Sequence, residues 1–286
     1  MQRGSAMGTG CMNGRLYSDI LTVQLNDKGV LDVDVVKGCT AGMAAKEGGC
    51  YGACYAATIA KFRGIDFAQH IVRKVHSLAQ AKKIEDAVRR APLGFFRVGT
   101  MGDPCHAWEE TTETIEWLAA FATPVIVTKH WMKATDEQFK RLINCGAILN
   151  TSVSAIDTPA QLAHRERELM RYERLGGLSF ARIVSCDFNT DNEEGAKCAE
   201  MQARLFTYQH VIDNPLRVAR NHPLVQRGVI RLQVVRDLNA KRTISIFNPA
   251  AYIGHCNDCP DQCGLSSRGA DHPTHVSRQH QLMELN

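Results

Sequence analysis

The chain has 286 residues, of which 44% are hydrophobic and 22% charged, and its net charge is +4. This hydrophobic fraction can supply a sizeable core, so the composition excludes a globally disordered protein, and the length fits one large domain. The sequence holds no apolar run that would cross a membrane and no secretory signal near its start, so we expect a cytoplasmic protein with no membrane partner.

Short β-like segments alternate with longer segments of helical periodicity from residue 95 onward. Strands are predicted at 95–100, 124–130, 147–157, 180–188 and 229–235, and helices at 108–122, 136–146, 159–175 and 192–209. This alternation predicts a parallel α/β sheet with right-handed crossovers, in a partial or full (β/α) TIM-type barrel. A doubly wound open sheet is the alternative.

Three regions are predicted along the chain. Residues 1–34 form an N-terminal extension, residues 35–240 form the barrel domain, and residues 241–286 form a C-terminal cysteine-rich metal-binding extension with a polar tail. The prediction rests on the span of the strand–helix alternation and on the cysteines that follow it.

Polar residues follow each of the first four predicted strands. They are Gly99 to Asp103, then Thr128, Lys129 and His130, then Asn150, Ser152, Ser154 and Asp157, and finally Ser185, Asp187, Asn189 and Asp191. Because the carboxyl ends of parallel strands meet at one edge of a sheet, we expect these side chains to line a shared pocket.

The chain has eleven cysteines, which is many for a cytosolic protein. In a reducing compartment, clustered cysteines bind metal or do chemistry more often than they form disulfides. Two groups are tight: Cys39, Cys50 and Cys54 form the first, and Cys256, Cys259 and Cys263 form the second. The others are scattered, namely Cys11, Cys105, Cys145, Cys186 and Cys198.

The first group lies in the segment GCTAGMAAKEGGCYGACY, residues 38–55, which also holds five glycines. Three thiolates can hold three irons of a cubane cluster, and glycines let backbone N–H groups approach the sulfurs. Zinc would favour a fourth cysteine or histidine nearby, and residues 38–61 contain no histidine, although a distant fourth ligand stays open.

Several motifs of the chain resemble the radical S-adenosylmethionine superfamily, most closely the branch of spore photoproduct lyase and related phage and bacterial proteins. They are Gly38-Cys39, the segment 49–56 (GCYGACYA), 97–103 (RVGTMGD), 127–129 (VTK), 152–157 (SVSAID) and 164–166 (HRE), within roughly residues 35–210. The sequence departs from the usual CxxxCxxC signature, because ten residues separate Cys39 from Cys50 and three separate Cys50 from Cys54. Cys11 and Cys105 are alternative ligands.

The resemblance implies a 4Fe–4S cluster held by Cys39, Cys50 and Cys54, with S-adenosylmethionine on the open iron. In this reading Lys129 meets the carboxylate of the cofactor, and Glu166, beside Arg165, packs near it. The implied cofactor-binding residues are Tyr55, Gly99, Thr100, Gly102, Asp103, Lys129, Ser152, Ser154, Glu166 and Asn189. Cys105 and Cys186, near predicted strand ends, are candidate catalytic hydrogen-atom donors.

The implied activity is reductive cleavage of S-adenosylmethionine to a 5′-deoxyadenosyl radical that takes hydrogen from a substrate. The electron comes from a flavodoxin- or ferredoxin-like donor. The branch points to a thymine-derived or other nucleobase in DNA as substrate, for repair, isomerisation or modification. Two alternatives stay open: rearrangement of a small metabolite or amino acid, and a zinc-stapled nucleic-acid-binding or adaptor protein without catalysis.

The second cysteine group stands in HCNDCPDQCG, residues 255–264. CxxC followed by CxxxC is a strong metal-binding pattern. The metal is either a second iron–sulfur cluster or zinc, which His255 could complete as a Cys₃His site. This group could also carry the catalytic cluster in place of the first.

Overall fold

The computed structural model describes residues 14–45, 49–236, 241–248 and 251–267. A seven-stranded sheet has the order β1-β2-β5-β6-β7-β8-β9. Its strands are β1 (Val23–Leu25), β2 (Leu31–Val33), β5 (Phe95–Val98), β6 (Thr123–Thr128), β7 (Ile148–Val153), β8 (Leu178–Ile183) and β9 (Val211–Asp213). All neighbouring strands are parallel except β1 and β2.

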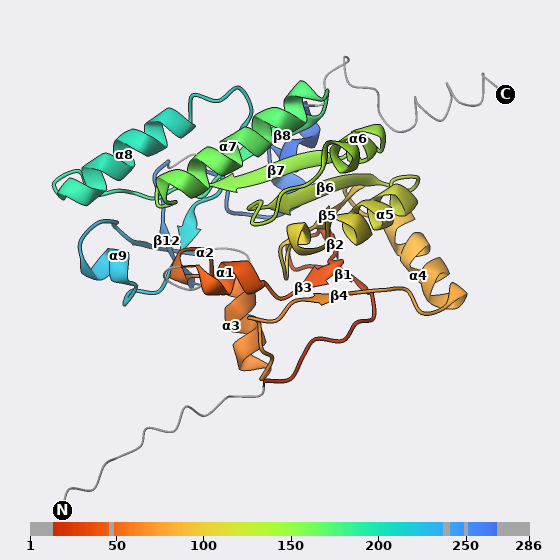
Figure 1. The fold of residues 1–286 in the computed structure, drawn as a ribbon. Coiled ribbons are helices and arrows are strands. Elements are labelled where there is room, and N and C mark those ends of the chain that lie inside the picture. Colours follow the sequence, from red (N-terminus) through yellow and green to blue (C-terminus); the bar gives the residue numbers. More distant parts are fainter. Residues whose placement is uncertain (1–13, 46–48, 237–240, 249–250, 268–286) are drawn as a thin grey trace, which may run out of the picture.

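Five helices cover one face of this sheet, which we call the outer face (Figure 1). They are α4 (Leu78–Arg89), α5 (Trp108–Leu118), α6 (Asp136–Asn144), α7 (Pro159–Arg174) and α8 (Glu193–Leu205). Thr135 and Thr158 form capping boxes that begin α6 and α7. Phe96, Ile126 and Leu149 alternate onto the outer face and join one buried cluster with residues of α4, α5 and α6.

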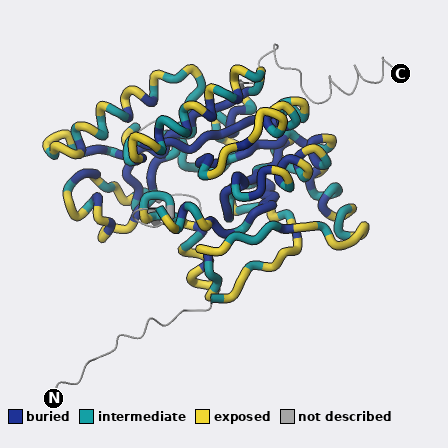
Figure 2. Tube along the Cα trace, viewed as in Figure 1, coloured by how far each residue is buried: buried dark blue, intermediate teal, exposed yellow. Residues whose placement is uncertain are grey.

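The opposite, inner face carries a second buried cluster. Phe95, Val125, Ile148 and Phe180 belong to it, and Cys263 from the C-terminal segment packs among them. Helices on one face are typical of a β/α barrel and not of a doubly wound sheet, so the fold is compatible with a partial barrel. The central strands β5 to β8 are mostly buried (Figure 2).

The prediction of four strands and four helices between residues 95 and 209 is confirmed, with ends shifted by a few residues. The fifth predicted strand, 229–235, is wrong as a member of the parallel sheet: that place belongs to β9. Instead β11 (Gln233–Arg236) pairs with β12 (Lys241–Ser245), beside β10 (Leu216–Arg217), in a separate antiparallel sheet. Within the described ranges β1 and β9 are the sheet's edges, and no closed barrel is formed.

The remaining elements lie near the carboxyl ends of the strands or at the C-terminus. They are β3 (Val36–Lys37), β4 (Ile71–Val72), α1 (Thr40–Ala44), α2 (Gly49–Gly52), α3 (Tyr55–Phe62), α9 (Pro223–Gln226) and the 3₁₀ turns 104–107, 256–258 and 262–267. The large sheet includes β1 and β2, so it begins before residue 35. None of the helices described here is long and apolar enough to span a membrane.

Candidate functional site at the carboxyl ends of the strands

The first cysteine group lies directly against the loop that follows β5. Gly38 N–H donates to Met101 O at 3.0 Å, and the Tyr55 hydroxyl donates to Thr100 O at 2.5 Å. A Cβ atom on Gly102 would stand 2.6 Å from Val36 O, so only glycine allows this approach of the two backbones. The cysteine segment and the 99–103 loop are therefore direct neighbours in the structure.

Cys54 and Cys50 share a hydrogen bond. The Cys50 thiol lowers the pKa of Cys54 to about 7, helped by the N–H groups of Ala56 and Ala57 and opposed by burial. Cys54 is the N-cap of α3, and its sulfur accepts from Ala57 N–H at 3.5 Å. Its sulfur thus lies where backbone N–H groups favour a thiolate.

Cys39 lies in a different environment, buried between α1 and the turn after β5. Burial raises the pKa of this thiol to about 12, and Asp103 adds to the rise. The N–H groups of Gly42 and Asp103 point at its sulfur. Such N–H···S contacts are the kind that stabilise and tune metal-bound thiolates.

His106 is a neighbour that the sequence did not predict. Its Nε2 atom lies 3.5 Å from Cys39 Sγ, and its ring stacks on His70 at a centroid distance of 4.7 Å. Burial lowers the pKa of His106, so the neutral ring is favoured. A histidine 67 positions from Cys39 is brought here by the turn that follows β5, and no local motif announces it.

As the side chains lie, no group of three or more His, Cys, Asp or Glu within residues 14–45, 49–236, 241–248 and 251–267 is arranged to hold a metal ion. The donor chemistry still fits a thiophilic group, because three thiols and several N–H donors meet at one end of the sheet. Binding would require the thiols to turn toward a common point. Cys11, the reserve ligand, lies outside the described residues.

Asp103 holds the ends of β5 and β6 together. One carboxylate oxygen accepts from the Thr128 hydroxyl at 2.6 Å and from Cys105 N–H at 3.1 Å. The other accepts from Lys129 N–H at 2.8 Å. Both carboxylate oxygens of Asp103 are therefore occupied by hydrogen bonds at this end of the sheet, and one of these bonds positions Lys129.

Lys129 belongs to a buried network of four groups. Its Nζ atom contacts the Tyr51 hydroxyl, stands 4.0 Å above the centroid of the Tyr51 ring, and is 4.0 Å from Asp157 Oδ1. Arg165 forms a close ion pair with the same oxygen of Asp157 and donates from Nε to Lys129 O at 2.9 Å. Tyr51 thus links the cysteine segment to the strand ends.

Burial and the neighbouring charges together determine which groups of this network hold a proton. Burial lowers the pKa of Lys129, partly offset by Asp157, and burial raises the pKa of the Tyr51 hydroxyl well above its usual range. Burial acts to raise the pKa of Asp157, but Lys129 and Arg165 outweigh it and lower the value. Asp157 is therefore ionised at neutral pH, with two cations to balance it.

The two predicted serines at the end of β7 lie in different surroundings, Ser152 within the strand and Ser154 directly after it. Ser154 is fully buried, and its hydroxyl donates to Val184 O at 2.7 Å, so it ties β7 to β8. Ser152 shares the inner face with Asn150 and with Arg182, its register partner on β8. Of the two, Ser152 is the one on the inner face at this end of the sheet.

Four predicted site residues are engaged elsewhere. Glu166 accepts from Arg204 Nη2 at 2.6 Å and contacts the Tyr208 hydroxyl, so it joins α7 to the end of α8. Asn189 bonds Gly228 O and Arg231. Cys105 is buried in the core of the outer face and Cys186 in the cluster beside α9, and burial raises both pKa values. Burial keeps both thiols protonated, and their role as hydrogen-atom donors stays a prediction.

Asp34, which the sequence analysis did not single out, is hydrogen-bonded to the loop after β5. Its two carboxylate oxygens accept from Thr100 N–H at 2.7 Å and Met101 N–H at 3.1 Å. Burial, with Asp32 nearby, raises its pKa to about 6 in spite of these bonds. The alternation of acids and valines in residues 31–36 is the signal that could have pointed to it.

A pH dependence of stability follows for Asp34. Its carboxyl has a higher pKa folded than unfolded, so the folded state holds the proton more tightly. The contribution of Asp34 to the free energy of unfolding is greatest below pH 4, falls as the pH rises through about 6, and is constant at higher pH. The total fall is about 3 kcal/mol. We expect the unfolding free energy of the wild type, minus that of Asp34→Asn, to fall by this order between pH 4 and 7.

Denaturant titrations at several pH values measure this difference. Asp27→Asn, at an exposed position in the turn between β1 and β2, is the control and should follow the wild type. A difference that stays flat or rises over this range would contradict the assignment to Asp34.

The second cysteine group lies on the inner face, toward the starts of the strands. Cys263 packs with Phe95, Val125 and Ile148, and Cys256 lies against the same cluster. The two cysteine groups are therefore set at different places along the sheet. The prediction that the second group binds an iron–sulfur cluster or zinc stays a prediction.

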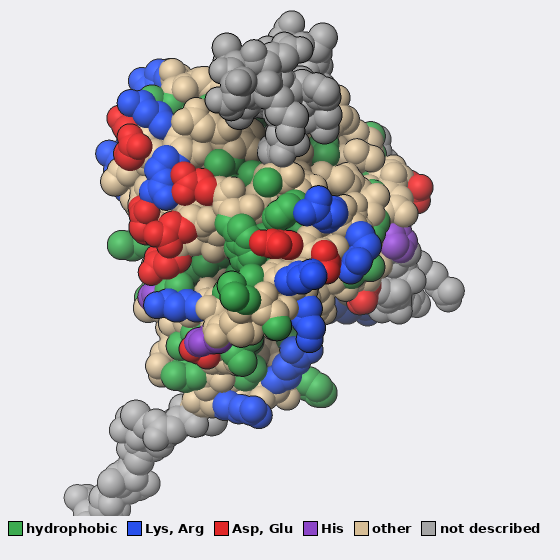
Figure 3. Space-filling view, turned by 90° about the vertical axis from the view of Figure 1, so that its right-hand side faces the viewer, with side chains coloured by type: hydrophobic (Ala, Val, Ile, Leu, Met, Phe, Trp, Pro, Cys, Tyr) green, Lys and Arg blue, Asp and Glu red, His purple; other side chains and the backbone are tan. Residues whose placement is uncertain are grey.

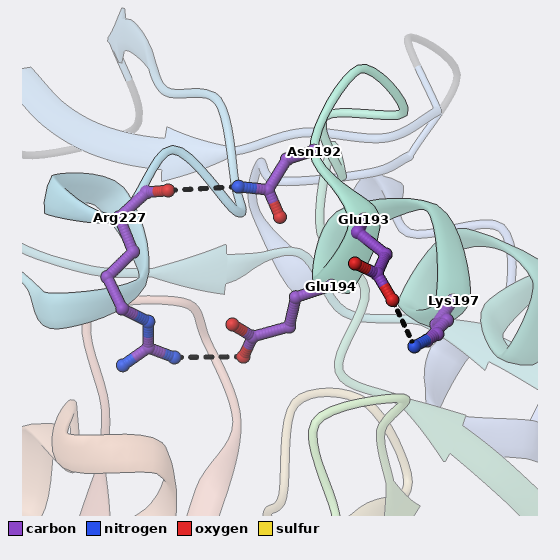
Figure 4. A pocket seen from close by; sticks show the side chains of 5 residues that line it. All are labelled: Asn192, Glu193, Glu194, Lys197 and Arg227. Atoms are coloured by element: carbon purple, nitrogen blue, oxygen red, sulfur yellow. Dashed lines mark hydrogen bonds and ion pairs between the residues drawn. The ribbon is translucent and has the colours of Figure 1, made fainter.

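A surface hollow lies at the start of α8. It is lined by Asn192, Glu193, Glu194, Lys197 and Arg227, and Figure 4 shows these side chains paired with one another. Glu193 bonds Lys197 at 2.7 Å and Arg227 bonds Glu194 at 2.9 Å. The hollow contains none of the predicted site residues.

Comparisons of the chain with protein-family models, with curated proteins and with solved structures find no match.

Proposed function

We propose that the protein is a radical S-adenosylmethionine enzyme. The observation that carries the proposal is the meeting of the three thiols of Cys39, Cys50 and Cys54 with the loop after β5 and with buried Lys129. Chemistry at this end of a parallel sheet is the rule for β/α folds. The resemblance of the same segments to that superfamily supports the proposal independently.

The three cysteines would hold the 4Fe–4S cluster, with backbone N–H groups against Cys39 and Cys54. When bound, the cluster and its cofactor supply a one-electron cleavage that yields a 5′-deoxyadenosyl radical. Lys129 offers a buried ammonium for the carboxylate of the cofactor, and to do so it exchanges the Tyr51 hydroxyl for that carboxylate. Arg165 and Asp157 hold Lys129 in place.

The first experiment measures 5′-deoxyadenosine after anaerobic reconstitution with iron and sulfide, reduction with dithionite and addition of S-adenosylmethionine. We expect the nucleoside from the wild type and at least a hundredfold less from Cys54→Ala. Cys198→Ala is the matched control, because this half-buried cysteine of α8 lies in another cluster. Equal yields from wild type and Cys54→Ala would overturn the proposal.

A second candidate is a zinc-stapled protein without catalysis, and His106 favours it. Tetrahedral zinc, with bonds of about 2.3 Å to sulfur and 2.0 Å to nitrogen, places these two ligand atoms about 3.5 Å apart. Cys39 Sγ and His106 Nε2 lie at this separation. The test is made in a chain that carries Cys259→Ser, so that the C-terminal cysteines do not supply the site. In that chain, uptake of zinc without iron, lost when His106→Ala is added, would support this candidate and remove the first.

The substrate proposal follows the resemblance and is a nucleobase in DNA. Figure 3 shows Lys and Arg side chains following one another down the lower part of one face, which suits a phosphate backbone. A base in duplex DNA would have to leave the stack to reach the site. DNA carrying modified thymine, tested against small metabolites and amino acids for stimulated nucleoside release, distinguishes the substrate classes.

A further inference from the structure

The C-terminal thiols form a cluster of their own, apart from the site described above. Cys256, Cys259 and Cys263 are all free, and each lies close enough to the other two for their charges to interact. The N–H groups of Asp261 and Gln262 point at the sulfur of Cys259. Three thiols and N–H donors within eight residues are the components of a thiolate metal site.

The backbone beside the third of these thiols is held in a left-handed turn. Gln262, Cys263 and Gly264 have φ values of 42°, 56° and 103°, so the left-handed region holds two residues that are not glycine. This conformation costs free energy for residues with a Cβ atom, and it persists where the surroundings impose it. A Cβ on Gly264 would lie 2.4 Å from the Phe180 ring, so the turn is pressed onto the sheet.

His255 is hydrogen-bonded through Nδ1, which leaves its Nε2 atom for a metal. Its Nδ1 atom lies 3.1 Å from Lys28 O, and a carbonyl can only accept, so Nδ1 carries the proton. The lone pair of the neutral ring is then on Nε2. Metal-binding histidines usually donate their second ring N–H to a carbonyl or a carboxylate in this way.

Cations surround the thiols. Arg182 Nη1 lies 4.0 Å from Cys263 Sγ, and the charges of Arg97 and Lys28 act on Cys256. Three thiolates around one divalent cation leave a net charge of about −1. Arg182 and Lys28 are positive side chains near these thiols, whereas Arg97 also pairs with Asp32. The segment 251–266 has only short 3₁₀ turns, so a metal would supply order that its own backbone bonds do not.

We propose that Cys256, Cys259 and Cys263 bind one zinc ion, with His255 Nε2 as the fourth ligand, and that this ion fixes the C-terminal segment to the inner face. Binding turns the three side chains toward a common point. Three S–H bonds lose their protons to solvent and three Zn–S bonds form, with no change of oxidation state. The site is separate from the proposed catalytic cysteines and stands without them.

The test uses the full chain with Cys39, Cys50 and Cys54 replaced by alanine, so that only the second group can supply clustered thiols. Zinc content is measured after purification, and cobalt(II) is then exchanged in to read thiolate coordination by absorption. We expect one zinc per chain, at least tenfold less in the added Cys259→Ser variant, and full content in the added Cys198→Ser control. Chelation should lower the melting temperature only where zinc is bound.

Three outcomes would overturn the proposal. They are a chain without zinc, zinc that survives Cys259→Ser, and iron with inorganic sulfide in place of zinc. If the triple alanine variant does not fold, the same comparison is made in the Cys54→Ala chain. Because the readout is metal content and not nucleoside formation, failure here and failure of the proposed enzymatic activity are distinguishable.

Discussion

Replacing Arg165 with methionine is expected to lower the free energy of unfolding by about 3–5 kcal/mol, because removal of one member of a buried ion pair leaves the other charge uncompensated. Arg165 is 1% exposed and pairs with Asp157, which is also buried. Methionine keeps the aliphatic part of the side chain, so the change removes the guanidinium with its ion pair, its hydrogen bond to Lys129 O and its contact with the Trp131 ring. Denaturant unfolding of both chains measures the loss of stability.

The control for this prediction is Arg167→Met, two positions along α7, where the side chain is exposed. We expect that change to stay within about 0.5 kcal/mol. Loss of Arg165 should also raise the pKa of Asp157, since Lys129, 4.0 Å away, is the remaining cation. Equal stabilities of the two variants would mean that the pair contributes no more than a surface charge.

Replacing Gly99 with alanine is expected to lower the free energy of unfolding by about 4 kcal/mol or more. The backbone of Gly99 has φ +101°, and a Cβ atom there would stand 2.1 Å from Val127 O. That oxygen belongs to β6, so neither atom can move without shifting the two strands whose ends carry the site. Reconstituted Gly99→Ala should therefore also lose nucleoside formation.

The variant Gly94→Ala separates the cost of the left-handed backbone from the cost of the close contact with Val127 O. Gly94 has φ +67°, and a Cβ added there meets nothing within 4 Å, so the change tests the left-handed backbone alone. We expect a loss of about 1–2 kcal/mol. If Gly99→Ala cost no more than Gly94→Ala, the contact between β5 and β6 would be looser than the distance indicates.

The sequence predicted the central part of the fold because its strands and helices have strong local signals. Strand β7 is an unbroken buried run, and α6 and α7 begin with threonine caps that a sequence displays. The three-residue strand β9 has no such signal, and only pairing with β8 makes it a strand. The 229–235 segment has an apolar pattern that suits a strand equally well in a second sheet.

The parts of the candidate site that are formed by residues close together in the sequence were predictable. The parts that depend on contacts between residues far apart in the sequence were not. The cysteines, the 99–103 loop and Lys129 stand in recognisable motifs. His106 and Asp34 act through positions remote in the chain, so local spacing could not assign them. Glu166 and Arg165 are neighbours on one helix, yet the helical rotation sends Arg165 into the buried network and Glu166 toward α8.

The inner face of the sheet is completed by residues 251–267, which come after all of its strands in the chain. Cys263 O accepts from Asn150 Nδ2, 113 positions earlier, and Ile253 O accepts from Lys28 Nζ, 225 positions earlier. A nascent chain can therefore build β2 and β5 to β9 in nearly sequential order while Phe95, Val125 and Ile148 still face water. Chains truncated before residue 251 lack the segment that covers these side chains, so they should be the ones that chaperones retain.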